Sequence, residues 1–415
     1  MTLVSSHAAE DALRARGVIL HSPASTVLQG IDPENFEPGA EIYPSVTLRG
    51  ASLQVGAGSK LGKAGGGYFE DVQVGRGCDL YGGYFKGCTL LDGVTIRGHA
   101  EVRGGTLLEE RCEAAHHVGY KMTVQLPFVV AGSLINFCDA LMAGGTSRKD
   151  HSEIGSTLAL YNYTPWGDKW ASLFGDVARG VFLRSPRVFV GGQTKIVSPV
   201  HVGFGAVIPA GCSVRRDVGE GRLAGDAGAS YDQAFDASML GAIEPKLRTT
   251  VRYIANLYAL LYWYREVRLP SAQGDAFLTR LYGAAMGQLE AGVAERLKRL
   301  DQVTARLPES LEAHERASSA AAAAGDDAAR ARHDRRASEH RRVLADWPRL
   351  RAGLASAPPP VEDEALKEIA GALHTQRVAS PETTYLSFMT DHLDPSLVAR
   401  GVAHMQAYTE QLCAE

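Results

Sequence analysis

Residues 190–214 read VGGQTKIVSPVHVGFGAVIPAGCSV and decide the fold, because a branched aliphatic residue stands at every sixth position. These residues are Val190, Ile196, Val202, Ile208 and Val214. An α-helix repeats at about 3.6 residues and a β-strand at about two, so neither explains a period of six. Six residues is the step of a triangular solenoid, in which each coil takes three steps and turns at each corner. We therefore predict aliphatic side chains that point into a three-walled prism, with small residues and glycines at its corners.

The same register recurs upstream, as in the run Leu90, Ile96, Val102 and Leu108, and it ends after Val218. From Thr249 onward the apolar residues step by three or four, which is typical of amphipathic helices. The fold class that we predict is mainly β, a left-handed parallel β-helix of hexapeptide repeats, with an all-α C-terminal domain. The expected units are an N-terminal segment 1–40, a solenoid with inserted loops 41–218, a linker 219–247 and a helical domain 248–415.

Composition restricts the class of protein. The net charge of −4 is too small to indicate nucleic acid or an anionic membrane as a partner. The six cysteines include no C-x-x-C pair, so zinc and disulfide frameworks are not expected. The first residues lack a basic region followed by an apolar run, and no stretch reaches the ~18 apolar residues of a membrane span. We therefore expect a cytoplasmic protein with no nucleic-acid or membrane partner.

Three motifs lie in the second half of the predicted solenoid. Residues 132–140 read GSLINFCDA, residues 161–165 read YNYTP and are followed by Lys169, and residues 189–200 read FVGGQTKIVSPV. In this order they resemble the C-terminal acetyltransferase domain of the bacterial bifunctional enzyme that makes UDP-N-acetylglucosamine. The resemblance covers about residues 41–218. It implies an acyltransferase of the hexapeptide-repeat type, a homotrimer, and a site in the groove between neighbouring prisms.

Two departures from the family pattern change what the resemblance implies. The glycine-rich segment of the partner nucleotidyltransferase domain does not open the chain, so a pyrophosphorylase activity is not implied. The family's catalytic histidine falls on Ser133, and a serine hydroxyl alone is too weak a general base. His151 is the natural substitute, because Asp150 or Glu153 can orient its imidazole and raise its basicity. The alternative is an exposed loop histidine near a corner.

The remaining candidate residues would hold the two substrates. By resemblance, Asn162 and Tyr163 contact the sugar and the acyl donor, and Lys169 faces a phosphate or carboxylate. Arg148 and Lys149 can face phosphate or form a solvated turn. Acetyl-CoA, the expected acyl donor, would lie along the coils. The further candidates are Asn136 for the acceptor, and Gly192 and Ala210 for the acyl donor.

The role of several residues has two possible interpretations from the sequence alone. Asn136 stands on an expected inward position, so either the register slips there or its side chain faces a wet cleft. Trp166 and Trp170 cap a substrate cleft or plug the prism. A further pool of histidines could bind zinc between coils and subunits, as in γ-type carbonic anhydrases, although the spacing is wider than in that class, and we assign no metal site. That pool is His99, His116, His117 and His201.

These observations favour an acyl-CoA-dependent acyltransferase that acts on an amino-sugar phosphate or a nucleotide sugar. The rival interpretation is a non-catalytic sugar-nucleotide-binding or assembly scaffold whose helical domain binds partners. The serine in place of the family histidine favours the rival, and the overall pattern of motifs favours the enzyme.

Overall fold

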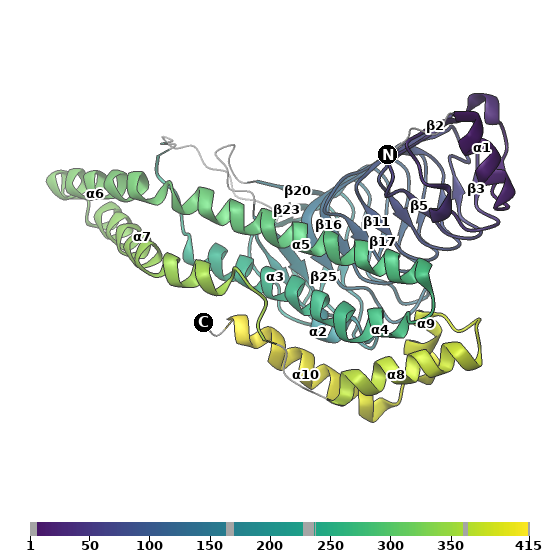
Figure 1. Ribbon diagram of the computed structural model, residues 1–415. Helices are drawn as coiled ribbons and strands as arrows, with labels where there is room; N and C mark the ends of the chain where they lie inside the picture. Colours follow the sequence, from purple (N-terminus) through teal and green to yellow (C-terminus); the bar gives the residue numbers. More distant parts are fainter. Residues whose placement is uncertain (1–5, 163–169, 227–235, 237, 360–363, 414–415) are drawn as a thin grey trace.

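The computed structural model describes residues 6–162, 170–226, 236, 238–359 and 364–413. Its first half is a parallel β-solenoid with three walls, and helices follow it in the chain (Figure 1). Wall 1 is a ten-stranded sheet made of β1 (Ile19–Leu20), β3 (Glu41–Ile42), β6 (Lys60–Leu61), β9 (Asp79–Leu80), β12 (Thr95–Ile96), β15 (Glu113–Ala114), β17 (Val130–Ala131), β19 (Glu153–Ile154), β22 (Phe189–Val190) and β25 (Val207–Ile208).

Walls 2 and 3 are joined into a single 16-stranded sheet by two long strands that turn the corner between them, β16 (Val118–Gln125) and β18 (Ile135–Met142). The other strands of wall 2 are β2 (Val27–Gln29), β4 (Val46–Arg49), β7 (Gly67–Glu70), β10 (Gly83–Lys86), β13 (Ala100–Val102), β20 (Ala159–Tyr161), β23 (Lys195–Val197) and β26 (Ser213–Val214). The other strands of wall 3 are β5 (Gln54–Val55), β8 (Gln73–Val74), β11 (Thr89–Leu90), β14 (Leu107–Leu108), β21 (Ser172–Phe174) and β24 (His201–Val202).

The period of six corresponds to one step per wall. Val190 lies on wall 1, Ile196 on wall 2 and Val202 on wall 3, and Ile208 and Val214 begin the next coil on walls 1 and 2. All five side chains are buried in the prism. The three-walled parallel β-helix that the sequence predicts is therefore confirmed.

The coils begin earlier in the chain than the sequence pattern indicated. Strand β1 pairs in parallel with β3, and β2 pairs with β4, so residues from Ile19 onward belong to the solenoid. Helix α1 (Ser6–Ala15) packs on β1 and β2 and buries Leu13 at this end of the prism. The short 3-10 turns η1 (Pro23–Ser25) and η2 (Pro33–Asn35) complete the first coil.

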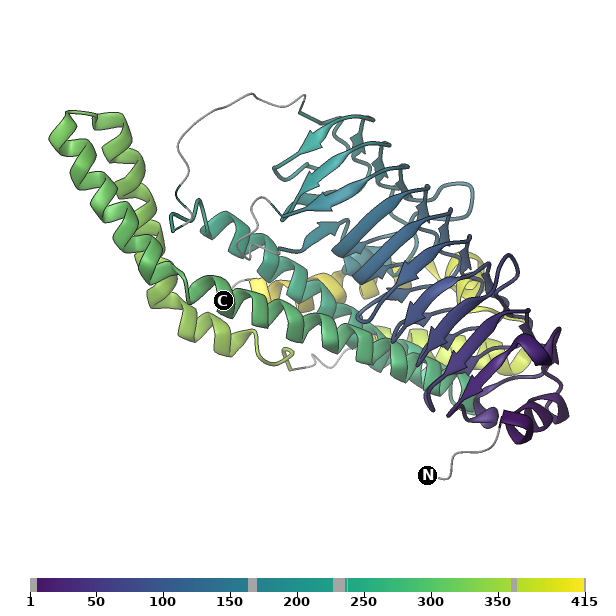
Figure 2. The ribbon, with the colours of Figure 1, turned by 90° about the horizontal axis from the view of Figure 1, so that it is seen from above.

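The C-terminal half is helical, as predicted. Helix α5 (Ala276–Thr304) packs along wall 3, on strands β8, β11, β14 and β16 (Figure 2). Helices α6 (Leu307–Ala324) and α7 (Asp327–Gly353) form an antiparallel hairpin that projects away from the solenoid. The remaining helices are α2 (Val177–Gly180), α3 (Glu244–Trp263), the π-helix η3 (Tyr264–Arg268), α4 (Leu269–Ser271), α8 (Glu364–Ala379), α9 (Tyr385–Ser387), the π-helix η4 (Phe388–His392) and α10 (Pro395–Cys413). Within the described residues, no helix combines the length and the apolar character that crossing a membrane requires.

A buried arginine joins the two halves. Arg268, at the end of η3, is completely buried, and its guanidinium forms two hydrogen bonds with the Glu110 carboxylate, one of them 2.8 Å long. Glu109 lies 3.6 Å from the same guanidinium and accepts a 2.6 Å hydrogen bond from the Tyr264 hydroxyl. The ring of Tyr385 stacks 3.3 Å from the guanidinium carbon. Because the charges are shielded from water, each depends on its partners for compensation.

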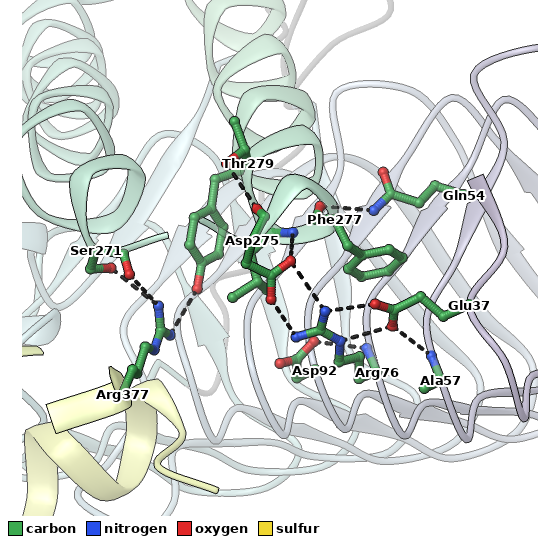
Figure 3. A network of polar contacts seen from close by, with 12 residues as sticks. Glu37, Gln54, Ala57, Arg76, Asp92, Ser271, Asp275, Phe277, Thr279 and Arg377 are labelled. Carbon is green, nitrogen blue, oxygen red and sulfur yellow. Dashed lines mark hydrogen bonds and ion pairs between the residues drawn. The ribbon is translucent and has the colours of Figure 1, made fainter. Parts of the chain in front are cut away.

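A second polar network ties the start of α5 to the solenoid (Figure 3). Arg76 binds the carboxylate of Glu37 at 2.6 Å and that of Asp275, the N-cap residue of α5, at 2.9 Å. Asp92 lies beneath this network and accepts a 2.7 Å hydrogen bond from the backbone N–H of Arg76. Burial raises the pKa of Asp92 to about 6, and the nearby Glu110 carboxylate adds to the shift.

Replacing Arg268 should weaken the attachment between the solenoid and the helical half and so destabilise the fold. We expect Arg268→Met to lower the free energy of unfolding by about 3–5 kcal/mol, because it leaves the Glu110 and Glu109 carboxylates buried without their cation. Chemical denaturation followed by tryptophan fluorescence measures the change. As a control, Arg316→Met removes an exposed arginine paired with Glu312 on α6 and should change the free energy of unfolding by less than about 1 kcal/mol. Equal effects of the two substitutions would contradict the role assigned to Arg268.

Asp92 should make stability depend on pH in a defined direction. Its folded pKa lies above its unfolded value, so the folded state binds the proton more tightly, and stability is lost as pH rises from the unfolded pKa through about 6. Asp92→Asn keeps an acceptor for Arg76 and removes the charge. We expect the variant to match the wild type near pH 4 and to exceed it above pH 6 by roughly 3 kcal/mol, as read from denaturation midpoints. The exposed Asp11→Asn is the control, and a variant that is less stable at neutral pH would refute this account.

Candidate functional site

The three edges of the prism carry the predicted site residues, and each edge is named here by the walls that it joins. The 1–2 edge contains residues 97–99, 115–117, 132–134, 155–157, 191–193 and 209–211. The 2–3 edge contains residues 103–106, Asn162 and residues 198–200. The 3–1 edge contains residues 109–112 and the insert 143–152. Because every coil returns to the same three edges, residues of successive coils stack in columns along them.

His151, the predicted base, lies on the 3–1 edge and is half-buried. Its Nδ1 lies 3.0 Å from the backbone carbonyl oxygen of Arg148. A carbonyl oxygen can only accept, so Nδ1 carries the proton and the neutral ring keeps a lone pair on Nε2. Among the described side chains no carboxylate is hydrogen-bonded to His151, and Asp150 binds Thr146 and Arg187 instead. The backbone carbonyl of Arg148, and not the predicted carboxylate of Asp150 or Glu153, is therefore the group that orients the imidazole.

The two basic residues of the same insert differ in their surroundings. Arg148 pairs with Glu113 at 2.7 Å, and its guanidinium also lies 3.4 Å from the carbonyl oxygen of Arg111. These contacts tie the insert to the preceding coil. Lys149 is exposed. Of the two predicted phosphate-binding residues, Lys149 is therefore the one whose ammonium group faces solvent.

Two further acceptor candidates that the structure describes, Asn136 and Asn162, do not lie on the edge of His151. Asn162 is exposed at the start of its insert on the 2–3 edge, while Tyr163 and Lys169, together with Trp166, lie outside the described residues. Asn136 points outward from wall 2, because its neighbours Ile135 and Phe137 turn into the prism.

The register has already shifted before β18, because Ala131 and not Val130 is the buried residue of β17. Asn136 therefore stands on the outer surface of wall 2, where its Oδ1 accepts a hydrogen bond from the Cys138 thiol. One copy of the chain does not bring Asn136, His151 and Asn162 to a common edge.

Gly192 and Ala210, the predicted donor-binding residues, share the 1–2 edge. The backbone of successive coils is in close contact there, since a Cβ on Gly191 would lie 2.4 Å from the Ala210 nitrogen and a Cβ on Gly155 would lie 2.2 Å from the Gly192 nitrogen. The N–H of Gly211 donates to the carbonyl of Gly192 at 2.8 Å. The glycines at positions 155 and 191 thus allow the backbones of successive coils to pack closely along this edge.

The same edge carries a polar cluster that combines Ser133, which stands at the position of the family's catalytic histidine, with three histidines of the possible zinc-binding pool. Ser133 Oγ lies 3.0 Å from His116 Nδ1. The ring of His117 lies edge-on to that of His116 and stacks on His99, with centroids 5.3 Å and 4.9 Å apart. Within the described residues no group of three such side chains is arranged to hold a metal ion. The spacing of 17 residues between His116 and Ser133 could have indicated the contact, had the length of this coil been known.

Two further residues lie against the helical domain. His201 lies in β24 on wall 3, where Arg252 of α3 donates a 2.9 Å hydrogen bond to its Nδ1. Burial and the Arg252 charge lower the pKa of His201. Trp170 is buried, and the Lys246 ammonium lies 5.9 Å from the centroid of its ring. Both residues thus contact the helical domain.

The curated proteins that the chain matches are consistent with the β-solenoid fold. No protein-family profile matches the chain. The chain is 27% identical over 208 residues, 49% of its length, to the bifunctional protein GlmU of Streptococcus equi subsp. zooepidemicus, of which the match covers 39%. It is 27% identical over 210 residues, 50% of its length, to the bifunctional protein GlmU of Nitratidesulfovibrio vulgaris, of which the match covers 41%. The chain thus spans less than half the length of the curated relatives that it matches. Together with the three-walled solenoid, these matches confirm the predicted resemblance to a hexapeptide-repeat, left-handed β-helix transferase.

Proposed function

We propose that the chain is an acyl-CoA-dependent acyltransferase that acts on an amino-sugar phosphate or a nucleotide sugar. The observation that carries the proposal is His151, a half-buried imidazole whose Nδ1–H is held by the Arg148 carbonyl, so that Nε2 is left as a base. The similarity of half of the chain to GlmU supports the choice of reaction class. A positioned histidine contributes typically about 10²–10⁴-fold to such a reaction.

The donor and the acceptor would use different edges of the prism. Acetyl-CoA, as the acyl donor, would lie along the 1–2 edge against Gly192 and Ala210, where the backbone of successive coils forms a smooth ridge. The acceptor amine or hydroxyl would lose its proton to His151, and Lys149 would attract its phosphate. Backbone N–H groups at the corners would stabilise the tetrahedral oxyanion.

This division of the site supports a homotrimer with the site between neighbouring prisms. His151 and the Gly192 column lie on opposite edges of wall 1, so a complete site needs a second copy to bring two different edges together. Helix α5 occupies wall 3 of its own chain. Walls 1 and 2 have outward-facing residues that are exposed, including Val207 on wall 1 and Tyr84 and Tyr161 on wall 2. Another copy would pack on these walls.

A non-catalytic scaffold remains the second candidate, and two observations favour it. Ser133 stands where the family has its catalytic histidine, and the hairpin of α6 and α7 projects away from the body as a surface on which a partner can dock. In that case the solenoid would bind a sugar nucleotide without transferring an acyl group to it.

Removal of the proposed base separates the two candidates. With acetyl-CoA and a panel of amino-sugar phosphates, we expect His151→Ala to lower kcat by about 10²–10⁴-fold, followed as the release of free thiol. The matched control is His392→Ala, which removes an exposed histidine on η4 and should leave kcat unchanged. Thiol release in His151→Ala that continues at the wild-type rate beyond one equivalent per chain would eliminate His151 as the base, and a wild-type chain with no turnover would favour the scaffold.

Crowding the 1–2 edge tests the donor site separately. Ala210 is exposed, so Ala210→Trp should fold normally and place a bulky ring on the ridge. We expect the Kd for acetyl-CoA, measured by isothermal titration calorimetry, to rise by at least about tenfold, equivalent to about 1.4 kcal/mol. Ala323→Trp, an exposed substitution on α6, is the control. An unchanged Kd would place the donor elsewhere.

A further inference from the structure

We propose that Ser133 and His116 form a nucleophile–base pair, in which Ser133 takes the acyl group from the thioester before it passes to the acceptor. The inference rests on the proposed acyltransferase function and adds a covalent step to it. A serine within hydrogen-bond reach of a histidine is the arrangement by which a weak hydroxyl becomes a nucleophile. The 3.0 Å separation of Ser133 Oγ and His116 Nδ1 meets that requirement.

Both members of the pair are accessible. His116 is exposed and Ser133 is half-buried, so a substrate can approach the hydroxyl without a conformational change. His117 packs edge-on against the His116 ring and restricts its orientation from the side. The backbone fixes the two residues as well, because the Leu134 N–H donates to the His116 carbonyl at 3.0 Å.

The pair is aligned with the proposed donor site. Along the 1–2 edge, successive coils place Ser133, Ser156, Gly192 and Ala210 in one column. The Thr157 N–H donates to the Ser133 carbonyl and the Gln193 N–H donates to the Ser156 carbonyl, each at 2.8 Å. Adjacent strands lie about 4.8 Å apart, so Ser133 is roughly 10 Å from Gly192 along the ridge. An extended thioester arm on Gly192 and Ala210 would reach the Ser133 hydroxyl with its acyl end.

Ser156 supplies a donor for the developing charge. Its Oγ accepts a 3.1 Å hydrogen bond from the Ser133 N–H, so it lies next to the nucleophile and retains its own hydroxyl proton for donation. A preorganised donor at the position of an oxyanion is one of the larger contributions to acyl transfer.

The chemistry balances without another reagent. Ser133 Oγ forms a bond to the thioester carbonyl carbon while its proton moves to His116 Nδ1. The carbon–sulfur bond then breaks, and the leaving thiolate takes that proton, which leaves an acyl-serine ester. In the second half, the acceptor loses its proton to His151 of a neighbouring copy, whose 3–1 edge faces this 1–2 edge in the proposed trimer, and attacks the ester. The departing Ser133 oxygen is reprotonated from solvent, to which His151 returns its proton.

The experiment is acetyl labelling of the full chain in the absence of acceptor. With acetyl-CoA, intact-mass spectrometry should show the gain of one acetyl group, and peptide mapping should place it on Ser133. We expect Ser133→Ala to abolish the label. His116→Asn keeps a hydrogen-bond acceptor but no base, and it should slow labelling by about 10²-fold or more. His151→Ala should acquire the label at the wild-type rate and fail to transfer it. Ser213→Ala is the folding and labelling control.

The outcomes distinguish this inference from the proposed function. If Ser133→Ala turns over acetyl-CoA and acceptor at the wild-type rate, the covalent step is wrong and the acyltransferase proposal stands. A label on any residue other than Ser133, or labelling of His116→Asn at the wild-type rate, also overturns the pair. A chain that neither binds acetyl-CoA nor releases thiol overturns both proposals. Thermal melting of each variant verifies that it is folded.

Discussion

The structure depends on one geometric constraint, which is that an aliphatic side chain must enter the prism at every sixth residue. To meet this constraint, each coil must turn at the same three edges as the coil before it. Residues that are 17 positions apart, such as His116 and Ser133, come into hydrogen-bond contact for this reason. The inward side chains supply the burial that stabilises the coils, and the edges are left to present polar groups in columns. Function can therefore be added at an edge without changing the core.

The helical half makes the three walls unequal. An ordinary solenoid of this kind presents three similar faces, but here α5 occupies wall 3, and ion pairs from α5 and η3 attach the helical half at the two borders of that wall. Arg296 of α5 pairs with Asp139 on the 2–3 side, and Arg268 pairs with Glu110 on the 3–1 side. This leaves walls 1 and 2, with the 1–2 edge between them, as the region opposite the helices. Gly192, Ala210 and the Ser133–His116 pair all lie on that edge.

Much of this architecture follows from local sequence. The register from Val190 to Val214 predicts the walls, and the change of period near Thr249 predicts the helices. The orientation of Asn136 could not be predicted from the sequence. Only the burial of Ile135 and Phe137 in the structure decides between a register slip and a wet cleft. The His151 tautomer depends on a backbone carbonyl, which no pattern of side chains reveals. The contact between Arg268 and Glu110 spans 158 residues, and the alignment of Ser133 with His116 depends on the length of the intervening coil.

The position of α5 also affects how the chain unfolds. In a stack of repeats each coil touches only its neighbours, so unfolding can begin at an end and spread one coil at a time. The single helix α5, which touches β8, β11, β14 and β16, connects four coils at once. Those coils cannot unfold separately without detaching the helix and breaking the ion pairs that hold it. The C-terminal half thus converts a linear array into a cooperative unit.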